Sequence, residues 1–344
     1  PTDVNISDAI SVGGGLIVNH EDGVIRSVDR AILADDSEGG RAYGTTTIRN
    51  AGEIVANYEY DPSNPDDQLY AAITLRGDWD DVLENSGTIT GDVIMGDGDD
   101  TVRLLAGSTI NGVLNGDRPL GDAADNTNGT PGTFDTLALQ GEGAIDVGGL
   151  SGFDRMEIDA GINELAVDGT ADVTGMSILV RSAMAGSYQS ATPVTFMTAD
   201  SFTGTFGSVT DELAFLDASN ATYSGGTATV DLVRNSANFN TLADTAKQAS
   251  IADALQGAGP NSAAYQHFIA IANAENTPEI LDGLSAESHA SAMGTQMVHA
   301  NLVNDAIQGR FDAAFGSEDG GIDPLAYDEP VKKNSEVFDH LLAK

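Results

Sequence analysis

The sequence contains no cysteine, few aromatic residues and few basic residues. Without cysteine the chain has no disulfide bond, no thiolate zinc site and no cysteine nucleophile. Aromatic residues make up 6% of the 344 residues, so large rings cannot dominate the core, and 40 glycines indicate a backbone that turns often. The sequence contains no run of about 18 apolar residues, so it predicts no membrane-spanning helix. These features favour stacked short strands.

The shortage of basic residues leaves the chain strongly acidic. Lysine and arginine total 15 against 53 aspartates and glutamates, which gives a formal net charge of −38. This charge repels phosphate backbones and anionic lipid, so we expect neither nucleic acid nor a membrane surface as a partner. An acidic chain can bind divalent cations, stay soluble when crowded or tolerate high salt, and the charge alone does not separate these properties.

Short repeated segments occur from the first residues to about residue 150. An Asn-x-Gly-x-Ile segment at residues 50–54 returns at 85–89, and an Asp-Thr-apolar-x-Leu segment at 100–104 returns at 135–139. Units this short cannot bury an apolar face alone, so neighbouring units must stack. We therefore predict a mainly β fold, a right-handed parallel β-helix or solenoid over residues 1–150. The aperiodic residues 115–133 are expected to form a loop thrown out from it.

The rest of the chain changes character in three steps. Residues 151–235 lose the repeat but keep strand patterns and larger apolar residues, which predicts a β cap that seals the end of the stack. From about residue 236 to 311 apolar residues follow helical spacing, so we predict an α-helical segment there. Residues 312–344 are predicted to be an acidic linker that ends in a short helix.

The order of these parts resembles a bacterial autotransporter of the type V secretion class. Residues 85–93, 96–101 and 149–154 look like passenger β-helix coils and their autochaperone-like cap, and residues 284–291, Leu-Ser-Ala-Glu-Ser-His-Ala-Ser, look like the helical segment that precedes the translocator barrel. The resemblance implies export through an outer membrane and display at the cell surface. The barrel's alternating strands are absent after Phe311, so we expect a truncated or processed chain, or a variant that reaches the surface otherwise.

One glycine-rich and aspartate-rich turn is a candidate metal site. Residues 95–102 fit most of a calcium-binding nonapeptide, in which Asp97, Asp99 and Asp100 would supply carboxylate oxygens. Sites of this kind need tandem copies, and residues 115–117 give only a partial echo. An acidic turn without a metal is therefore the simpler interpretation, and calcium is the one cofactor left open.

Signals for catalysis are weak. None of the five histidines lies in a metal-ligand spacing such as His-Glu-x-x-His, and no Gly-x-Ser-x-Gly occurs. We expect His289 to hold a structural position on a helix. A polysaccharide lyase or hydrolase is the main enzymatic alternative, because β-helices host such enzymes and paired carboxylates such as Asp99 and Asp100 are plentiful. Residues 115–133 would be the wall of its cleft.

The sequence therefore predicts a non-enzymatic structural or adhesive protein at the surface of a Gram-negative bacterium. Its partner would be a cell-surface or extracellular ligand, or further copies of itself through exposed strand edges. The outer membrane would be contacted only through a barrel that this sequence lacks. A calcium-dependent self-assembling surface component is a further alternative, alongside the polysaccharide-acting enzyme.

Overall fold

The computed structural model describes residues 8–36, 40–56, 71–117, 134–141, 143–159, 163–182 and 193–284. Its contacts divide the chain into Pro1–Asp282 and Gly283–Lys344. The helices predicted after residue 285, His289 and most of the loop at 115–133 lie outside the described residues. Within the part that is described, no helix is both long enough and apolar enough to cross a membrane.

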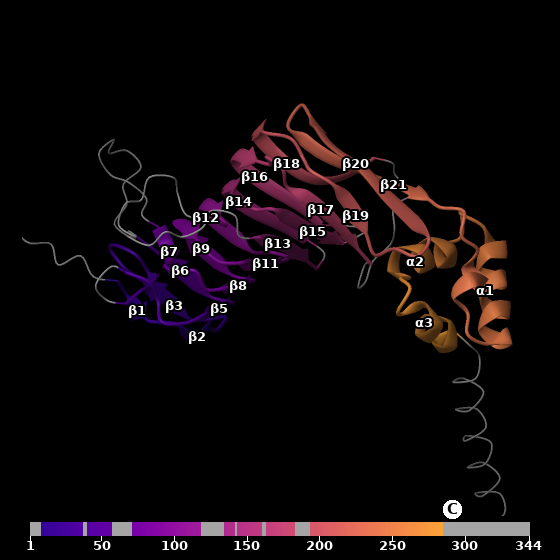
Figure 1. Cartoon of the computed structure of the whole chain (residues 1–344), viewed down its shortest axis with the longest axis horizontal. Coiled ribbons are helices and arrows are strands. Elements are labelled where there is room, and N and C mark those ends of the chain that lie inside the picture. Colours follow the sequence, from indigo (N-terminus) through magenta and orange to yellow (C-terminus); the bar gives the residue numbers. More distant parts are fainter. Residues whose placement is uncertain are drawn as a thin grey trace, which may run out of the picture. The chain divides into compact units, whose positions relative to one another are not determined.

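The fold is mainly β, with two long sheets of parallel strands (Figure 1). In the eight-stranded sheet each strand pairs with the strand of the next repeat, and every pairing is parallel. The Asn-x-Gly segments lie side by side there, with Asn50 opposite Asn85, so the predicted stacking of the repeat is confirmed. In stacking order its strands are β2 (Gly15–Asn19), β5 (Thr46–Asn50), β8 (Val82–Asn85), β11 (Thr101–Leu105), β13 (Thr136–Gln140), β15 (Arg155–Asp159), β17 (Ser177–Arg181) and β19 (Val209–Asp211).

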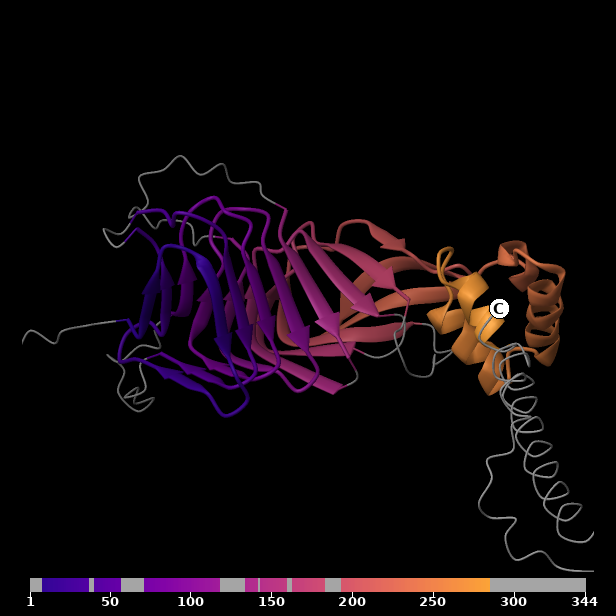
Figure 2. The ribbon, with the colours of Figure 1, turned by 90° about the horizontal axis from the view of Figure 1, so that it is seen from below.

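The thirteen-stranded sheet begins as two rows of short strands that merge. Both rows join β12 (Thr109–Asn115), and from there single longer strands continue the sheet (Figure 2). The first row is β1 (Ile10–Val12), β4 (Ile32–Ala34), β7 (Ala71–Leu75) and β10 (Asp92–Ile94), the second is β3 (Val24–Arg26), β6 (Glu53–Val55) and β9 (Thr88–Thr90), and the longer strands are β14 (Gly143–Ser151), β16 (Asn163–Asp172) and β18 (Val194–Thr203).

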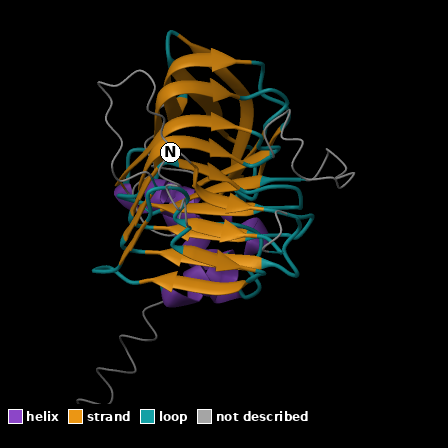
Figure 3. Cartoon of the chain, turned by 90° about the vertical axis from the view of Figure 1, so that its left-hand side faces the viewer, coloured by secondary structure: helices purple, strands orange, loops and turns teal. Residues whose placement is uncertain are grey.

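Alternation along each strand creates the core. In the eight-stranded sheet Ile48, Leu83 and Val102 lie in register on neighbouring strands and are fully buried, whereas the residues on either side of them in sequence face outward or sideways. Where neighbouring strands repeat this pattern in register, their buried aliphatic side chains line up in columns in the core. Figure 3 shows how the strands stack. The core of the parallel strands forms with few aromatic residues, because branched aliphatic side chains fill the space between the sheets.

Glycines stack where the chain turns between the sheets. A Cβ atom on Gly87 would lie 2.1 Å from the carbonyl oxygen of Gly52, and one on Gly52 would lie 2.2 Å from that of Gly23. A distance this short is not tolerated, so the strand would have to move away from its neighbour. The glycine of the Asn-x-Gly repeat is therefore needed for close backbone approach.

We expect Gly87→Ala to destabilise the fold by about 1–3 kcal/mol, the usual cost of overpacking. Gly44→Ala is the matched control, because a Cβ atom there meets no atom within 4 Å. Thermal unfolding followed by circular dichroism measures both variants. An unchanged melting temperature for Gly87→Ala would contradict the close approach.

Antiparallel strands and helices follow the parallel stack. Parallel pairing continues past the boundary expected at residue 150, through β15 to β19, and antiparallel pairing starts where β18 meets β21 (Thr227–Arg234), which pairs with β20 (Leu216–Ser224). A capping box of Thr245 and Gln248 starts the first α-helix. The helices are η1 (Phe239–Leu242), α1 (Ala246–Ala258), α2 (Ala263–Ile271) and α3 (Thr277–Gly283), which confirms helical structure after residue 236.

An aromatic cluster joins the helices to the strands. The ring of Phe239 lies 4.7 Å from that of Phe215 and 4.9 Å from that of Phe268, and all three side chains are buried. The guanidinium of Arg234 lies over the rings of Phe215 and Phe239. Phe215 belongs to residues 151–235, where the sequence places larger apolar residues, whereas Phe239 and Phe268 belong to the helical segment, so the cluster packs the two parts against each other.

Candidate functional site

The outer face of the eight-stranded sheet carries charged side chains in register. The row consists of Arg49 on β5, Glu84 on β8 and Arg103 on β11, which are neighbours in register. Their side chains point outward, because the residue that follows each of them in sequence is buried. Glu84 accepts from Arg49 Nε at 2.8 Å and lies 3.4 Å from Arg103 Nη1. Both arginines of this row therefore contact the same glutamate, which lies on the strand between them.

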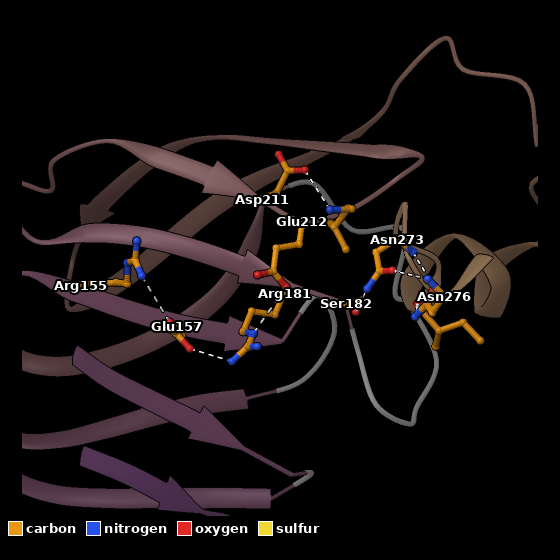
Figure 4. Close-up of polar contacts among 10 residues, drawn as sticks. Arg155, Glu157, Arg181, Ser182, Asp211, Glu212, Asn273 and Asn276 are labelled. Carbon is orange, nitrogen blue, oxygen red and sulfur yellow. Dashed lines mark hydrogen bonds and ion pairs between the residues drawn. The ribbon is translucent and has the colours of Figure 1, made fainter. Parts of the chain in front are cut away.

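A second network continues on the same face from β15 onward (Figure 4). Glu157 accepts from Arg181 Nη1 at 2.8 Å and lies 3.6 Å from Arg155 Nη1, and Arg181 Nε lies 3.6 Å from Glu212. The side chain of Glu157 is only 15% exposed, so its charge is held close to both guanidinium groups. Arg181 links carboxylates on both sides of β17.

Two hollows on this face have Gln140 in their lining in common, and together we call them the sheet groove. The first has a volume of about 280 Å³ and includes Val18, Arg49 and Glu84 in its lining. The second has a volume of about 620 Å³ and is lined by residues of β13, β15 and β17, by Glu212, and by the loop between α2 and α3. Gln140 lines both, so the groove runs across the strands.

The loop between α2 and α3 closes one end of the sheet groove. Asn273 donates through Nδ2 to Ser182 Oγ at 3.1 Å, and its backbone forms a bridge with Leu213. The loop itself is fixed because Asn276 accepts from the Asn273 N–H at 2.8 Å and donates to the Ile271 carbonyl. Ser182 and Asn273, which are 91 residues apart in sequence, therefore meet in the lining of the second hollow (Figure 4).

The carboxyl group of Asp159 lies in the floor of the second hollow. Burial raises the pKa of Asp159 above its usual range, and the positive charge of Arg181 opposes the shift. Asp159 and Arg181 are register neighbours on β15 and β17. The groove thus combines glutamates that contact arginines with one carboxyl group whose pKa is raised by burial.

A row of aspartates runs along one turn of successive repeats, which we call the aspartate stack. The carboxylate of Asp81 accepts from the Thr46 N–H, that of Asp100 from the Asp81 N–H at 2.7 Å, and that of Asp135 from the Asp100 N–H at 2.8 Å. Asp154 adds a fourth member by accepting from the Asp135 N–H at 3.0 Å. Each side chain therefore ties its turn to the turn before it.

Burial governs the protonation of this stack. Asp100 and Asp135 are fully buried, and one carboxylate oxygen of each has no hydrogen-bond partner among the described residues. Burial raises the pKa of Asp100 to about 9 and those of Asp81 and Asp135 to about 7, although the N–H group bound by each carboxylate opposes the shift. The charges of neighbouring aspartates add to the increase.

The three aspartates of the predicted calcium site do not converge. Asp100 belongs to the buried aspartate stack, whereas Asp99 accepts from the Phe134 N–H at 2.8 Å. Asp97 forms a parallel bridge with Asp78 through its backbone. Over the residues that the structure covers, no three histidine, aspartate or glutamate side chains are grouped to hold a metal ion. Calcium binding at this turn stays a prediction that this geometry does not favour.

Sequence reasoning missed the residues of the sheet groove. The only local signal was alternation, as in Arg155-x-Glu157-x-Asp159, which places three charged side chains on one face of a strand. Their partners come from other strands and from the loop after α2, at spacings that no motif encodes. The aspartate stack did leave a signal, because the Asp-Thr-apolar-x-Leu segment repeats.

Comparison with protein-family models, with curated proteins and with solved structures finds no match for this chain. The resemblance to autotransporter passengers, with the function that it implies, therefore stays a prediction.

Proposed function

We propose that this chain is a non-enzymatic adhesive or structural protein displayed at the surface of a Gram-negative bacterium, built as a right-handed parallel β-helix with a β cap. Export by an autotransporter-like route would bring it there, as the resemblance of residues 284–291 implies. Its partner would be an extracellular or cell-surface ligand bound on the side of the helix, with assembly into a homo-oligomer as a further possibility.

The order of the parts is the main support for this proposal. Parallel strands stack in register through eight layers of one sheet, antiparallel strands follow, and helices come last. A scaffold of this kind offers a long outer face made of side chains rather than a single deep active site. The sheet groove is lined by side chains of several strands, which suits binding by many weak contacts.

The polysaccharide-acting enzyme is kept as the second candidate because of Asp159. Burial raises the pKa of Asp159, which lies two residues after the arginine-paired Glu157 on β15, and glycosidases use a pair of carboxyl groups as acid and base. The arginine contacts of Glu157 and Glu212 weigh against this role, because a paired carboxylate is a poor nucleophile. Neither calcium binding nor calcium-dependent assembly has an observation in its favour.

Surface display is tested by protease treatment of intact cells of the bacterium that makes the protein. An antibody against the chain should detect its loss from intact cells, while a periplasmic protein in the same cells stays whole. Protection of the chain until the outer membrane is permeabilised would contradict the proposal. The purified chain should be digested by the same protease, which shows that protection in cells does not come from the fold.

A further inference from the structure

We infer that the sheet groove binds a neutral linear polysaccharide that lies across the strands. This inference deepens the proposed function by naming its ligand class, and it rests on that function for the source of the ligand. Three observations support it: the direction of the groove across the strands, the engagement of the backbone groups of its floor in the sheet, and the pairing of most of its charges.

The direction of the groove fits a polymer. The first hollow reaches β2 through Val18, and the second reaches the residue after β19 through Glu212. Neighbouring strands lie ~4.8 Å apart, so eight strands span roughly 34 Å. Because Gln140 lines both hollows, a ligand that occupies one can continue into the other. Only an extended chain molecule uses this whole length.

The floor of the groove offers side chains alone. Inner strands such as β11 and β15 have a parallel partner on each side, so their N–H and C=O groups are engaged in the sheet. An extended peptide normally binds by adding a strand to a free sheet edge, and a sheet face provides no such edge. A ligand here must be held through its own substituents, which favours a chain with many hydroxyl groups.

The charges in the groove favour a neutral chain. Arg49 and Arg103 contact Glu84, and Arg181 contacts Glu157 and Glu212, so most of these charges are paired within the protein. Asp159 and Glu275 also line the second hollow, so the groove has more acidic than basic side chains and disfavours an anionic chain. The net charge of −38 repels polyanions such as polyuronates. Paired charges still accept from and donate to hydroxyl groups, and neutral polar side chains lie between them: Ser86, Gln140, Ser182 and Asn273.

The test is binding of the purified full chain to an array of neutral oligosaccharides, with hexagalacturonate and a glucosamine hexamer as charged probes. Calorimetry then measures the neutral hexamer that binds best. A trimer of the same sugar should bind roughly tenfold more weakly, because it fills only one hollow. Gln140→Ala should weaken binding of the hexamer by roughly twofold to tenfold, the value of one hydrogen bond.

Glu53→Gln is the matched control. Glu53 is an exposed glutamate that pairs with Arg26 at 3.4 Å, as Glu84 pairs with arginine, but it lies on β6 in the other sheet. Glu84→Gln should therefore weaken binding and Glu53→Gln should not. Thermal unfolding of each variant separates lost binding from lost folding.

Several outcomes would overturn the inference. These are no binding of any neutral oligosaccharide, tighter binding of either charged hexamer, equal affinity for trimer and hexamer, and equal losses in Glu84→Gln and Glu53→Gln. Release of new reducing ends would support the groove as a glycan site but refute the non-enzymatic part of the proposed function. Surface display is decided separately by protease treatment of cells, so the two proposals can fail independently.

Discussion

An Asp100→Asn variant is expected to be more stable than the parent chain at pH 8, with an advantage that disappears in acid. Asp100 is fully buried, its Oδ1 accepts from the Asp81 N–H, and its Oδ2 has no partner among the described residues. Asparagine keeps the Oδ1 acceptor and never ionises. It therefore imitates the protonated carboxyl group that burial imposes, since burial raises the pKa of Asp100 to about 9.

The sign of the pH dependence follows from proton binding. A carboxyl group whose pKa is raised by folding binds its proton more tightly in the folded state, so its contribution to stability is complete below about pH 4. That contribution falls by ~1.4 kcal/mol per pH unit until the pH reaches the folded pKa. For Asp81 and Asp135 the loss ends at a pKa of about 7, and for Asp100 at a pKa of about 9.

The parent chain should therefore lose stability steadily between about pH 4 and pH 9, and Asp100→Asn should lose less. We expect the variant to gain about 2–5 kcal/mol relative to the parent at pH 8. Below about pH 5 it should equal the parent or fall ~1–2 kcal/mol short, because its amide Nδ2 has no acceptor. Denaturant unfolding followed by circular dichroism at several pH values measures both trends.

Asp92→Asn is the matched control for this series. The Asp92 carboxylate also accepts from a backbone N–H, that of Val113 at 2.7 Å, but this contact is exposed. Its substitution shows what the loss of an exposed carboxylate that accepts from a backbone N–H does to the slope of stability against pH. If Asp100→Asn gives that same slope, the aspartate stack is not protonated in the folded protein.

The repeats explain how much of the fold could be predicted. Segments that recur thirty-five residues apart do lie in adjacent strands, because each complete turn of the stack uses similar residues at similar places: Asn50 beside Asn85 and Thr101 beside Thr136. Helical spacing likewise placed Tyr265, Phe268 and Ile269 on one buried face of α2. Local periodicity therefore identified both kinds of structure.

The boundary expected at residue 150 marks the end of the sequence repeat, whereas parallel pairing continues beyond it. Asn19, Asn50 and Asn85 are hydrogen-bonded in a row, which we call the asparagine stack. It stops where Leu104 takes the position beside Asn85, and later turns differ in length, so the repeat fades while parallel pairing continues. The repeat marks the turns, whereas the sheet depends on alternation alone. The sheet groove was hidden for a related reason, since Ser182 and Asn273 are 91 residues apart.

Asn50→Ala is expected to cost about 2–4 kcal/mol of stability, because it breaks the asparagine stack in its centre. Asn50 is 2% exposed, accepts from Asn19 Nδ2 at 2.8 Å and donates to Asn85 Oδ1 at 2.8 Å. Removing its amide leaves Asn85 Oδ1 buried without this donor, and a buried polar atom that loses its partner keeps the full cost of desolvation. The cost at Asn19 is smaller, because its Nδ2 still donates to the carbonyls of Gly23 and Glu53.

An Asn50→Asp variant separates the hydrogen bonds from the packing. It has nearly the same shape, but an oxygen replaces the Nδ2 donor and faces the Asn85 Oδ1 acceptor, so the loss at neutral pH should exceed that of alanine. Asn111→Ala is the control, because the Asn111 side chain makes an exposed contact of 3.4 Å with Thr90 and no other side-chain hydrogen bond among the described residues, and we expect a change within about 0.5 kcal/mol. Equal losses for Asn50→Asp and Asn111→Ala would mean that the asparagine stack follows from the pairing of the strands and contributes little to holding them together.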